Sequence, residues 1–178
     1  MATQDTDSFL ISIAGRDQVG VVSAVTGYLF EVGANLADSA FAVLGEGFEF
    51  SCVAEFNLDV SAKEVQAGLT GLAALEQARV SVSRFPFDLM RGESGKVTHI
   101  VEFSGGDRPG LVARVSEVLV EYGANIVRMS SRRIATDNGF DYRTRFAVNV
   151  GVDRIAALEN ALSNTAGSMR LNCKVETP

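Results

Sequence analysis

The sequence has few of the residues on which enzyme chemistry depends. It contains one histidine, two cysteines, three prolines and no tryptophan among 178 residues. There is no cluster of metal ligands, no nucleophile motif and no GxxxxGK[ST] phosphate loop. The single histidine, His99, falls in a predicted strand, where a packed or strand-end residue is more common than a catalytic base. We therefore expect a protein that is not an enzyme and that holds neither a metal nor a cofactor.

Long apolar segments are also absent. No apolar run is long enough to span a membrane, and the polar, acidic start of the chain lacks the pattern of a secretory signal. Cys52 and Cys173 fall on the apolar side of predicted strands, which is typical of small core residues, and neither a disulfide nor a CxxC pair is indicated. Together these features predict a cytoplasmic protein, and its 47% hydrophobic residues are sufficient for two cores.

What the sequence does contain is an internal repeat. The segment 15–36 returns ninety positions later as 105–126, with ten of its twenty-two positions unchanged; average composition would give roughly one or two matches. A repeat this long that occurs only twice indicates two small domains of one fold and argues against a solenoid. The unchanged pairs are Gly15/Gly105, Asp17/Asp107, Gly20/Gly110, Val22/Val112, Val25/Val115, Leu29/Leu119, Glu31/Glu121, Gly33/Gly123, Ala34/Ala124 and Asn35/Asn125.

Each copy begins with an alternating apolar segment, then a glycine-containing turn, then apolar residues at helical spacing. In the first copy, residues 9–13 alternate as a strand does, the turn covers 15–20, and the period lengthens over 22–32. The second copy repeats this order. The apolar residues at helical spacing are Val22, Val25, Leu29 and Val32 in the first copy, and Val112, Val115, Leu119 and Tyr122 in the second.

The ends of these predicted helices carry residues typical of caps. Gly33 and Gly123 follow the last helical positions, where glycine readily adopts the left-handed conformation that ends a helix. At the start of the second copy's helix, Asp107 offers a carboxylate to free N–H groups, and Pro109 has no N–H to lose. We therefore expect Asp107 and Pro109 to begin the helix.

The rest of each copy adds two strands, a helix and a last strand. Alternate positions in 48–58 and 140–150 share one apolar parity, which indicates one covered sheet face. These positions are Phe48, Phe50, Cys52, Ala54, Phe56 and Leu58, and Phe140, Tyr142, Thr144, Phe146, Val148 and Val150. The second helix is predicted from Val65, Leu69, Leu72 and Leu75 in the first copy and from Ile155, Leu158 and Leu162 in the second. A last strand closes each copy, and Val80 and Val82 in the first copy correspond to Leu171 and Cys173 in the second.

The element order is therefore β-α-β-β-α-β, written twice. This order predicts an α+β chain of two tandem ferredoxin-like domains, each a four-stranded antiparallel sheet with two helices on one face. We place the first domain at 8–85, a linker at 86–96 and the second domain at 97–176.

The two copies differ in charge. Residues 1–90 carry 4 basic and 12 acidic side chains, a net charge of −8, whereas 91–178 carry 12 and 10, a net charge of +2. In the second copy Arg143 and Arg145 alternate with the buried parity, so they point from the open sheet face, near Arg128, Arg132 and Arg133. This face is either a solvated charged surface or a docking surface for an acidic partner, which could be a protein or the first copy of a neighbouring chain.

The turn between the first strand and the first helix of each copy is the best candidate for a binding site. Glycine allows positive φ and close approach of the backbone, and a helix start presents free N–H groups that suit a carboxylate. Asp17 and Asp107 could attract a cation, while Asn35 and Asn125 can both donate and accept hydrogen bonds. Such a set suits a free amino acid, although the same residues also serve simply to start and stop a helix.

Two motifs at matched spacing carry a family resemblance. Asp-Arg-Pro-Gly-Leu-Val at 107–112 with Gly-Ala-Asn-Ile at 123–126, and Asp-Gln-Val-Gly-Val-Val at 17–22 with Gly-Ala-Asn-Leu at 33–36, resemble the signature of ACT domains. These are small ligand-sensing modules with the same β-α-β-β-α-β order. A tandem pair is most similar to the glycine cleavage system transcriptional repressor family. That resemblance implies a cytoplasmic regulator that responds to glycine and contacts a DNA-bound activator.

The resemblance also implies where an effector binds. ACT effectors commonly lie at an interface between two domains, against the first turn and the start of the second strand. Val19 stands where the second copy has Pro109 and where the family usually has proline, so we expect the second-copy site to be the better formed. The residues implicated are Asp17, Gly20, Val21, Asn35 and Leu36 in the first copy, and Asp107, Gly110, Leu111, Asn125 and Ile126 in the second.

Three functions are weighed on this sequence. We favour a sensor of a small amino acid, glycine or serine first, whose output is altered docking of a transcriptional regulator, with Arg143, Arg145 and Arg133 as candidate partner-binding residues. The alternative is an interaction module whose turns bind nothing, and association of two chains is open for both.

RNA binding is disfavoured because Phe48 and Phe50 share the covered parity and the pI is near 4.8. The first copy also resembles the regulatory part of formyltetrahydrofolate deformylase, but a second ACT-like copy stands where that enzyme's catalytic domain would begin.

Overall fold

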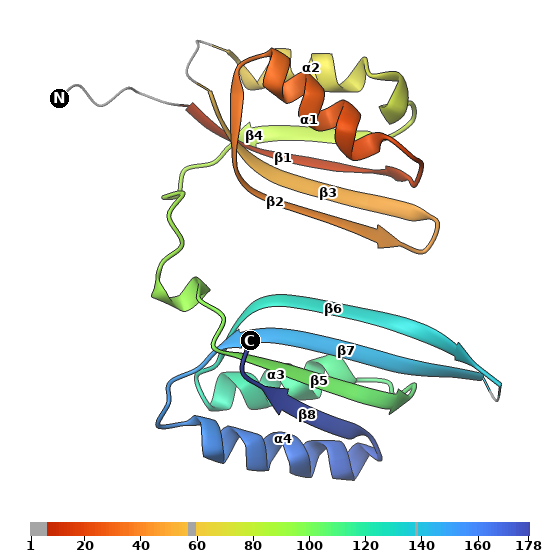
Figure 1. Cartoon of the computed structure of the whole chain (residues 1–178), viewed down its shortest axis with the longest axis vertical. Helices are drawn as coiled ribbons and strands as arrows, with labels where there is room; N and C mark the ends of the chain where they lie inside the picture. The colour runs from red at the N-terminus through yellow and green to blue at the C-terminus, as the bar shows by residue number, and fades with distance from the viewer. Residues whose placement is uncertain (1–6, 57–59, 138) are drawn as a thin grey trace. The chain divides into compact units, whose positions relative to one another are not determined.

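The computed structural model describes residues 7–56, 60–137 and 139–178. The chain divides into two compact units, Met1–Leu89 and Met90–Pro178. Each unit is a four-stranded antiparallel sheet, with strand orders β2-β3-β1-β4 and β6-β7-β5-β8, and two α-helices cover one face of each sheet (Figure 1). This confirms the predicted tandem β-α-β-β-α-β fold.

The bounds of the elements follow the repeat closely. The first unit contains β1 (Asp7–Arg16), α1 (Val21–Glu31), β2 (Ala34–Leu44), β3 (Gly47–Phe56), α2 (Ala62–Thr70), the 3₁₀ turn η1 (Ala73–Leu75) and β4 (Arg79–Arg84). The second contains the 3₁₀ turn η2 (Glu93–Gly95), β5 (His99–Gly106), α3 (Leu111–Glu121), β6 (Asn125–Thr136), β7 (Gly139–Asn149), α4 (Ile155–Met169) and β8 (Asn172–Glu176). The helix-ending glycines are confirmed, since Gly33 has a φ of 78° and Gly123 a φ of 66°.

The first helix of each unit packs on its sheet through residues spaced by four. The buried side chains are Val21, Val25 and Leu29 in α1 and Leu111, Val115 and Leu119 in α3. The prediction that Val22 leads this stripe is wrong, because α1 begins at Val21 and the i, i+4 row through Val21 faces the sheet. Val22 consequently keeps 39% of its surface exposed.

The covered face of each sheet is the predicted one except at its tip. Phe48, Phe50, Cys52, Ala54 and Phe56 are all buried, whereas Leu58 lies outside the described residues. Thr144, Phe146, Val148 and Val150 are buried in the second unit, and Tyr142 is partly buried. Phe140 is an error of prediction, since it is 60% exposed: it pairs with Ala135 in the hairpin of β6 and β7, which continues past the end of β5 (Figure 1).

Two details in the second half of each unit differ from the prediction. The helix predicted to reach Leu75 stops at Thr70, because Gly71 caps it and Leu72 is extended, although Leu75 is still buried on η1. The last strands also align two residues later than predicted: Val80 lies opposite Ile13 as Cys173 lies opposite Phe103. Leu171 therefore precedes β8.

The two cysteines have the structural role expected of them. Cys52 is buried in the first core, and Cys173 packs, partly buried, against the second. Burial raises the pKa of both thiols to about 11. They are therefore protonated at neutral pH and poor nucleophiles.

A glycine inside α1 offers a test of the helix packing. A Cβ added at Gly27 meets no atom within 4 Å, so Gly27→Ala should raise the free energy of unfolding by about 0.5–1 kcal/mol by restricting the unfolded chain. The same change at Gly68 in α2 drives the new methyl group into the ring of Tyr28, which should cancel the gain. Thermal unfolding of both variants measures the two changes in stability. An equal increase in stability for Gly27→Ala and Gly68→Ala would contradict the contact between Gly68 and Tyr28.

Candidate functional site

The glycines immediately before α1 and α3 adopt the same backbone conformation. Gly20 and Gly110 precede the first helical residues with φ of 95° and 84°, in the left-handed region that only glycine occupies readily. Neither helix has a side-chain cap, whereas α2 begins with a full capping box between Ser61 and Glu64. The N–H groups in the first turns of α1 and α3 therefore lack a side-chain acceptor and can receive a carboxylate from a ligand.

The aspartates of the two turns differ in whether they form an ion pair. Asp107 does not cap α3 as predicted, because its Oδ2 accepts a hydrogen bond from Arg133 Nη2 at 3.2 Å, and that ion pair holds the side chain away from the helix start. Asp17 is exposed, and its side chain has no partner among the residues that the structure describes. Only the first copy thus keeps an unpaired carboxylate beside the free N–H groups.

A side chain from each turn holds it against the far end of the second helical segment. Gln18 Nε2 donates to the carbonyl oxygen of Ala74 at 2.7 Å, and Arg108 Nε donates to that of Met169 at 3.1 Å. Pro109 is not the first helical residue as predicted, because the glycine at 110 caps α3 and the helix begins one residue later. The sequence did not predict the contacts of Gln18 and Arg108 with these carbonyl oxygens. The feature that could have indicated them is a long hydrogen-bond donor side chain at the same position of both copies.

The asparagines at the start of β2 and β6 are also differently engaged. Asn125 Nδ2 donates to the carbonyl oxygen of Ser94 at 2.8 Å, and Asn149 Nδ2 donates to those of Glu93 and Lys96. Asn125 therefore helps to fix the segment that precedes β5. Asn35 Nδ2 makes only a long contact of 3.5 Å to a carboxylate oxygen of Glu55. The expectation that the second copy offers the better site gains no support, because its polar candidates already bind within their own domain.

The candidate residues of one copy do not meet. In the first unit the turn follows Arg16, which pairs with Gly47, whereas Asn35 pairs with Glu55. Eight residues of β3 separate these rungs, which is about 26 Å at a rise of about 3.3 Å per residue. The second unit has the same separation along β7, from Asp141 to Asn149. One domain therefore cannot hold a small ligand between its turn and its asparagine.

The apolar candidates contribute backbone only or belong to the core. Val21 and Leu111 are buried, so their side chains pack on the sheet and only their N–H groups face the turn. Leu36 and Ile126 are partly buried and pack against the two cores. What a ligand meets at each turn is therefore glycine, N–H groups of the first helical turn and one aspartate, although in the second copy the N–H of Leu111 already donates to the carbonyl oxygen of Arg108 at 3.2 Å.

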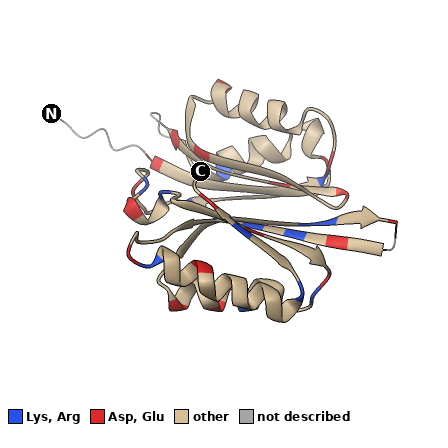
Figure 2. Cartoon of the chain, turned by 60° about the horizontal axis from the view of Figure 1, so that its bottom comes forward, with Lys and Arg blue, Asp and Glu red and all other residues tan. Residues whose placement is uncertain are grey.

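The arginines of the second sheet lie on both of its faces. Arg143 lies opposite Arg132, and Arg145 opposite Ser130, on the face that carries no helix. Arg133 lies opposite Tyr142 on the helix side, so its grouping with Arg143 and Arg145 is wrong. Acids are interleaved with the open-face arginines, as Figure 2 shows along these strands, and Arg143 Nε lies 3.6 Å from Glu102 Oε1.

The two aromatic residues that echo an RNA-binding motif, Phe48 and Phe50, do not form an RNA-binding face. Phe48 and Phe50 are buried between the first sheet and its helices, and their surfaces cannot stack on bases.

Comparison with known proteins agrees with this architecture. The described residues form two ferredoxin-like domains in tandem, and the first helix of each follows a glycine and has no side-chain cap. Residues 7–83 and residues 99–167 each match the ACT domain. The chain belongs to the ACT-domain family, as a tandem pair, and is an ACT-domain regulatory protein.

Solved structures share the whole tandem arrangement. The crystal structure of an unknown protein from Galdieria sulphuraria matches with a TM-score of 0.77 and 26% identity over 98% of this chain and 99% of that chain. The crystal structure of a candidate glycine cleavage system transcriptional repressor matches with a TM-score of 0.69 and 16% identity over 98% of both chains, which shows a shared fold. Among curated proteins, none shows significant sequence similarity to the chain. Within residues 7–56, 60–137 and 139–178, no helix is long and apolar enough to cross a membrane.

Proposed function

We propose that this protein senses a small amino acid, glycine or serine, and modulates transcription by changing how it docks to a partner regulator. The observation that carries the proposal is the pair of uncapped helix starts in two ACT domains. Backbone N–H groups of one turn take the carboxylate of the ligand, and Asp17 attracts its ammonium. Glycine and serine suit a site that offers backbone and short polar side chains but no apolar pocket.

The geometry requires a second domain for any contact with an asparagine. Since the turn and Asn35 lie about 26 Å apart along the sheet, a ligand at one turn reaches the start of β2 or β6 only in another ACT domain. We propose an effector site of this interfacial kind, with Asn35 as the more available asparagine because its amide is less engaged. A ligand that binds one domain arrangement better than another shifts the equilibrium between them.

Thermal unfolding with added amino acids tests the proposal. Glycine or serine at saturating concentration should raise the melting temperature, with about 2.7 kcal/mol of stabilisation at one hundred times Kd. Glycinamide lacks the carboxylate and acetate lacks the ammonium, so neither should reproduce the effect. If no amino acid shifts the transition, the ligand-independent interaction module becomes the better description.

Two aspartate variants locate the ammonium site. Asp17→Asn removes the unpaired carboxylate and should weaken glycine or serine binding about tenfold, as expected for the loss of one charge-assisted hydrogen bond. Asp107→Asn changes an aspartate that is already paired with Arg133, so binding should change much less. Calorimetric titration of both variants measures this, and the reverse order of effects would move the site to the second turn.

The output is proposed to be a protein contact on the open face of the second sheet. Arg143 and Arg145 lie there, although Glu102 partly neutralises Arg143. An acidic surface on the partner would complement the surplus positive charge, and such an association weakens as salt rises. Arg145→Gln should weaken binding of the regulator without changing the response of the melting temperature to the amino acid.

A further inference from the structure

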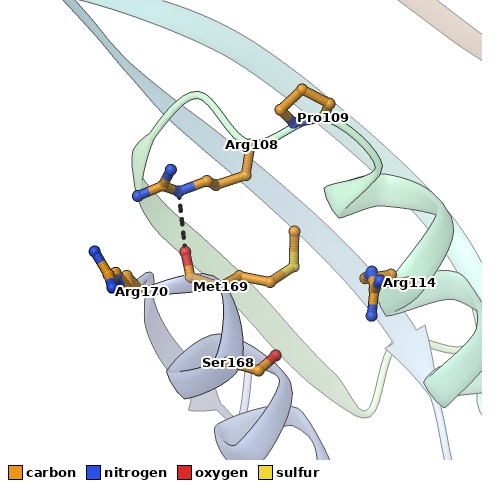
Figure 3. Close-up of a pocket in the computed structure, with 6 residues that line it drawn as sticks. All are labelled: Arg108, Pro109, Arg114, Ser168, Met169 and Arg170. Carbon is orange, nitrogen blue, oxygen red and sulfur yellow. Dashed lines mark hydrogen bonds between the residues drawn. The ribbon is translucent and has the colours of Figure 1, made fainter.

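A cavity opens in the second domain on the helix side of its sheet, beside the turn before α3. It has a volume of about 380 Å³ and lies between the turn before α3 and the end of α4 (Figure 3). Three of its lining residues are arginines from three different segments: the turn, the first part of α3 and the residue after α4. The lining residues are Arg108, Pro109, Arg114, Ser168, Met169 and Arg170.

The positive charge of this cavity is not balanced within the domain. No carboxylate lines it. Arg108 uses its Nε to hold the carbonyl oxygen of Met169, which leaves its two terminal nitrogens for another acceptor. Among the described residues neither Arg114 nor Arg170 forms an ion pair, and the positive end of the α3 dipole lies at the same place. Three like charges around one concavity create a positive potential that favours the binding of an anion between them.

The fold itself does not require these arginines, as the first domain shows. There Gln18 makes the contact that Arg108 makes, to the carbonyl oxygen of Ala74. Gln77 has a φ of 65° and precedes the residue that packs on Gly15, just as Arg170 has a φ of 57° and precedes the residue that packs on Gly105. The same backbone is thus built with uncharged side chains in one domain and with arginines in the other.

Arg170 also occupies a position that other residues fill more easily. It caps α4 in the left-handed conformation, where glycine is usual because a side chain costs free energy there. The residue present instead is an arginine, and it belongs to the lining of the cavity, next to Met169 (Figure 3).

We propose that this cavity binds a small organic anion with at least two negative charges, carried by phosphate or carboxylate groups. Its volume is within the range of small-molecule sites. Arginine forks match phosphate and carboxylate oxygens with paired hydrogen bonds. The absence of a lining acid leaves nothing to receive an ammonium, so this ligand differs in chemistry from the zwitterion proposed for the turns. The inference therefore goes beyond the proposed function.

Thermal unfolding of the full chain tests it with inorganic phosphate and with citrate, each against sodium chloride of equal ionic strength. Either probe should raise the melting temperature in a saturable way; a stronger effect of phosphate indicates a phosphate ester, and a stronger effect of citrate indicates a polycarboxylate. Arg114→Gln, on the helix surface, should weaken the apparent affinity about tenfold. Arg132→Gln, the same change on the open sheet face, should leave it unaltered. An equal response in both variants, or none in the wild type, would overturn the proposal.

A second variant separates binding from stability. Arg170→Gly should raise the melting temperature in chloride, because glycine adopts the left-handed conformation freely, and should weaken the response to phosphate or citrate. Loss of the response in a more stable protein cannot be attributed to unfolding. Both variants should keep the response to glycine or serine, so a protein that responds to the amino acid but to neither anion would leave the proposed function standing and remove this site.

Discussion

Phe103→Ala is expected to destabilise the second domain by about 3–5 kcal/mol, the range for deletion of a buried phenylalanine ring. Phe103 is fully buried at the centre of β5, opposite Thr144 on β7 and Cys173 on β8. Its ring fills the space between the sheet and its helices, and small neighbours cannot close the cavity left behind. Because β5 leads directly into the turn before α3, loss of this packing also loosens the candidate ligand site.

Phe140→Ala is the matched control for that prediction. It removes the same side chain from the same domain, but the ring is 60% exposed at the hairpin tip, so the change should stay within about 0.5 kcal/mol. Hydrogen exchange of β7 amides in the full chain reports the stability of this domain separately from that of the first. Comparable losses in the two variants would show that the core of the second domain is not where the structure places it.

Gly105→Ala is expected to cost about 2–3 kcal/mol, mostly through the backbone. Gly105 has a φ of 145°, which alanine rarely adopts, and an added Cβ would lie 2.7 Å from Leu171 Cδ2. The leucine side chain can move aside in part, but the backbone conformation cannot change without moving the end of β5. Weaker binding of any ligand that uses the following turn should accompany the loss of stability.

The neighbouring glycine provides the control for this second prediction. An added Cβ at Gly106 meets no atom within 4 Å, and its φ lies outside the left-handed region. Gly106→Ala should therefore cause no measurable loss in denaturant unfolding. If the two alanine variants are equally destabilised, the cost comes from the strand as a whole and not from the conformation and contact of Gly105.

The fold could be predicted because its signals are local and occur twice. Alternation in 9–13 and 48–56 specified which strand residues are covered, and the glycines at 33 and 123 specified where helices end. The prediction for Phe140 was wrong because alternation predicts which face of a strand a side chain lies on but not whether that face is covered: nothing in the sequence says that the β6–β7 hairpin continues past the end of β5. The prediction that Val22 faces the sheet was wrong because the conformation of the preceding glycine, Gly20, decides which residue is the first of α1.

The chemistry of the turns could be predicted only in part. The sequence showed that a helix starts after each glycine, and both Gly20 and Gly110 adopt the expected conformation. It could not show that Asp107 pairs with Arg133 or that Asn125 binds Ser94, because those partners are 26 and 31 residues away and come from other elements. Identical motif residues therefore differ between the two copies in which hydrogen-bonding groups remain available to a ligand.

The sequence by itself determined that this protein is two copies of one α+β unit, because hydrophobic period and glycine position act over a few residues. Only the tertiary structure decided which groups meet. Antiparallel pairing sends each turn and its asparagine to opposite ends of the sheet, although Asp17 and Asn35 are only 18 positions apart in the sequence. The same folding brings Arg108, Arg114 and Arg170 around one cavity, although more than fifty residues lie between the last two. Distance along the chain and distance in space are unrelated once strands pair, and that is why sites must be read from the folded molecule.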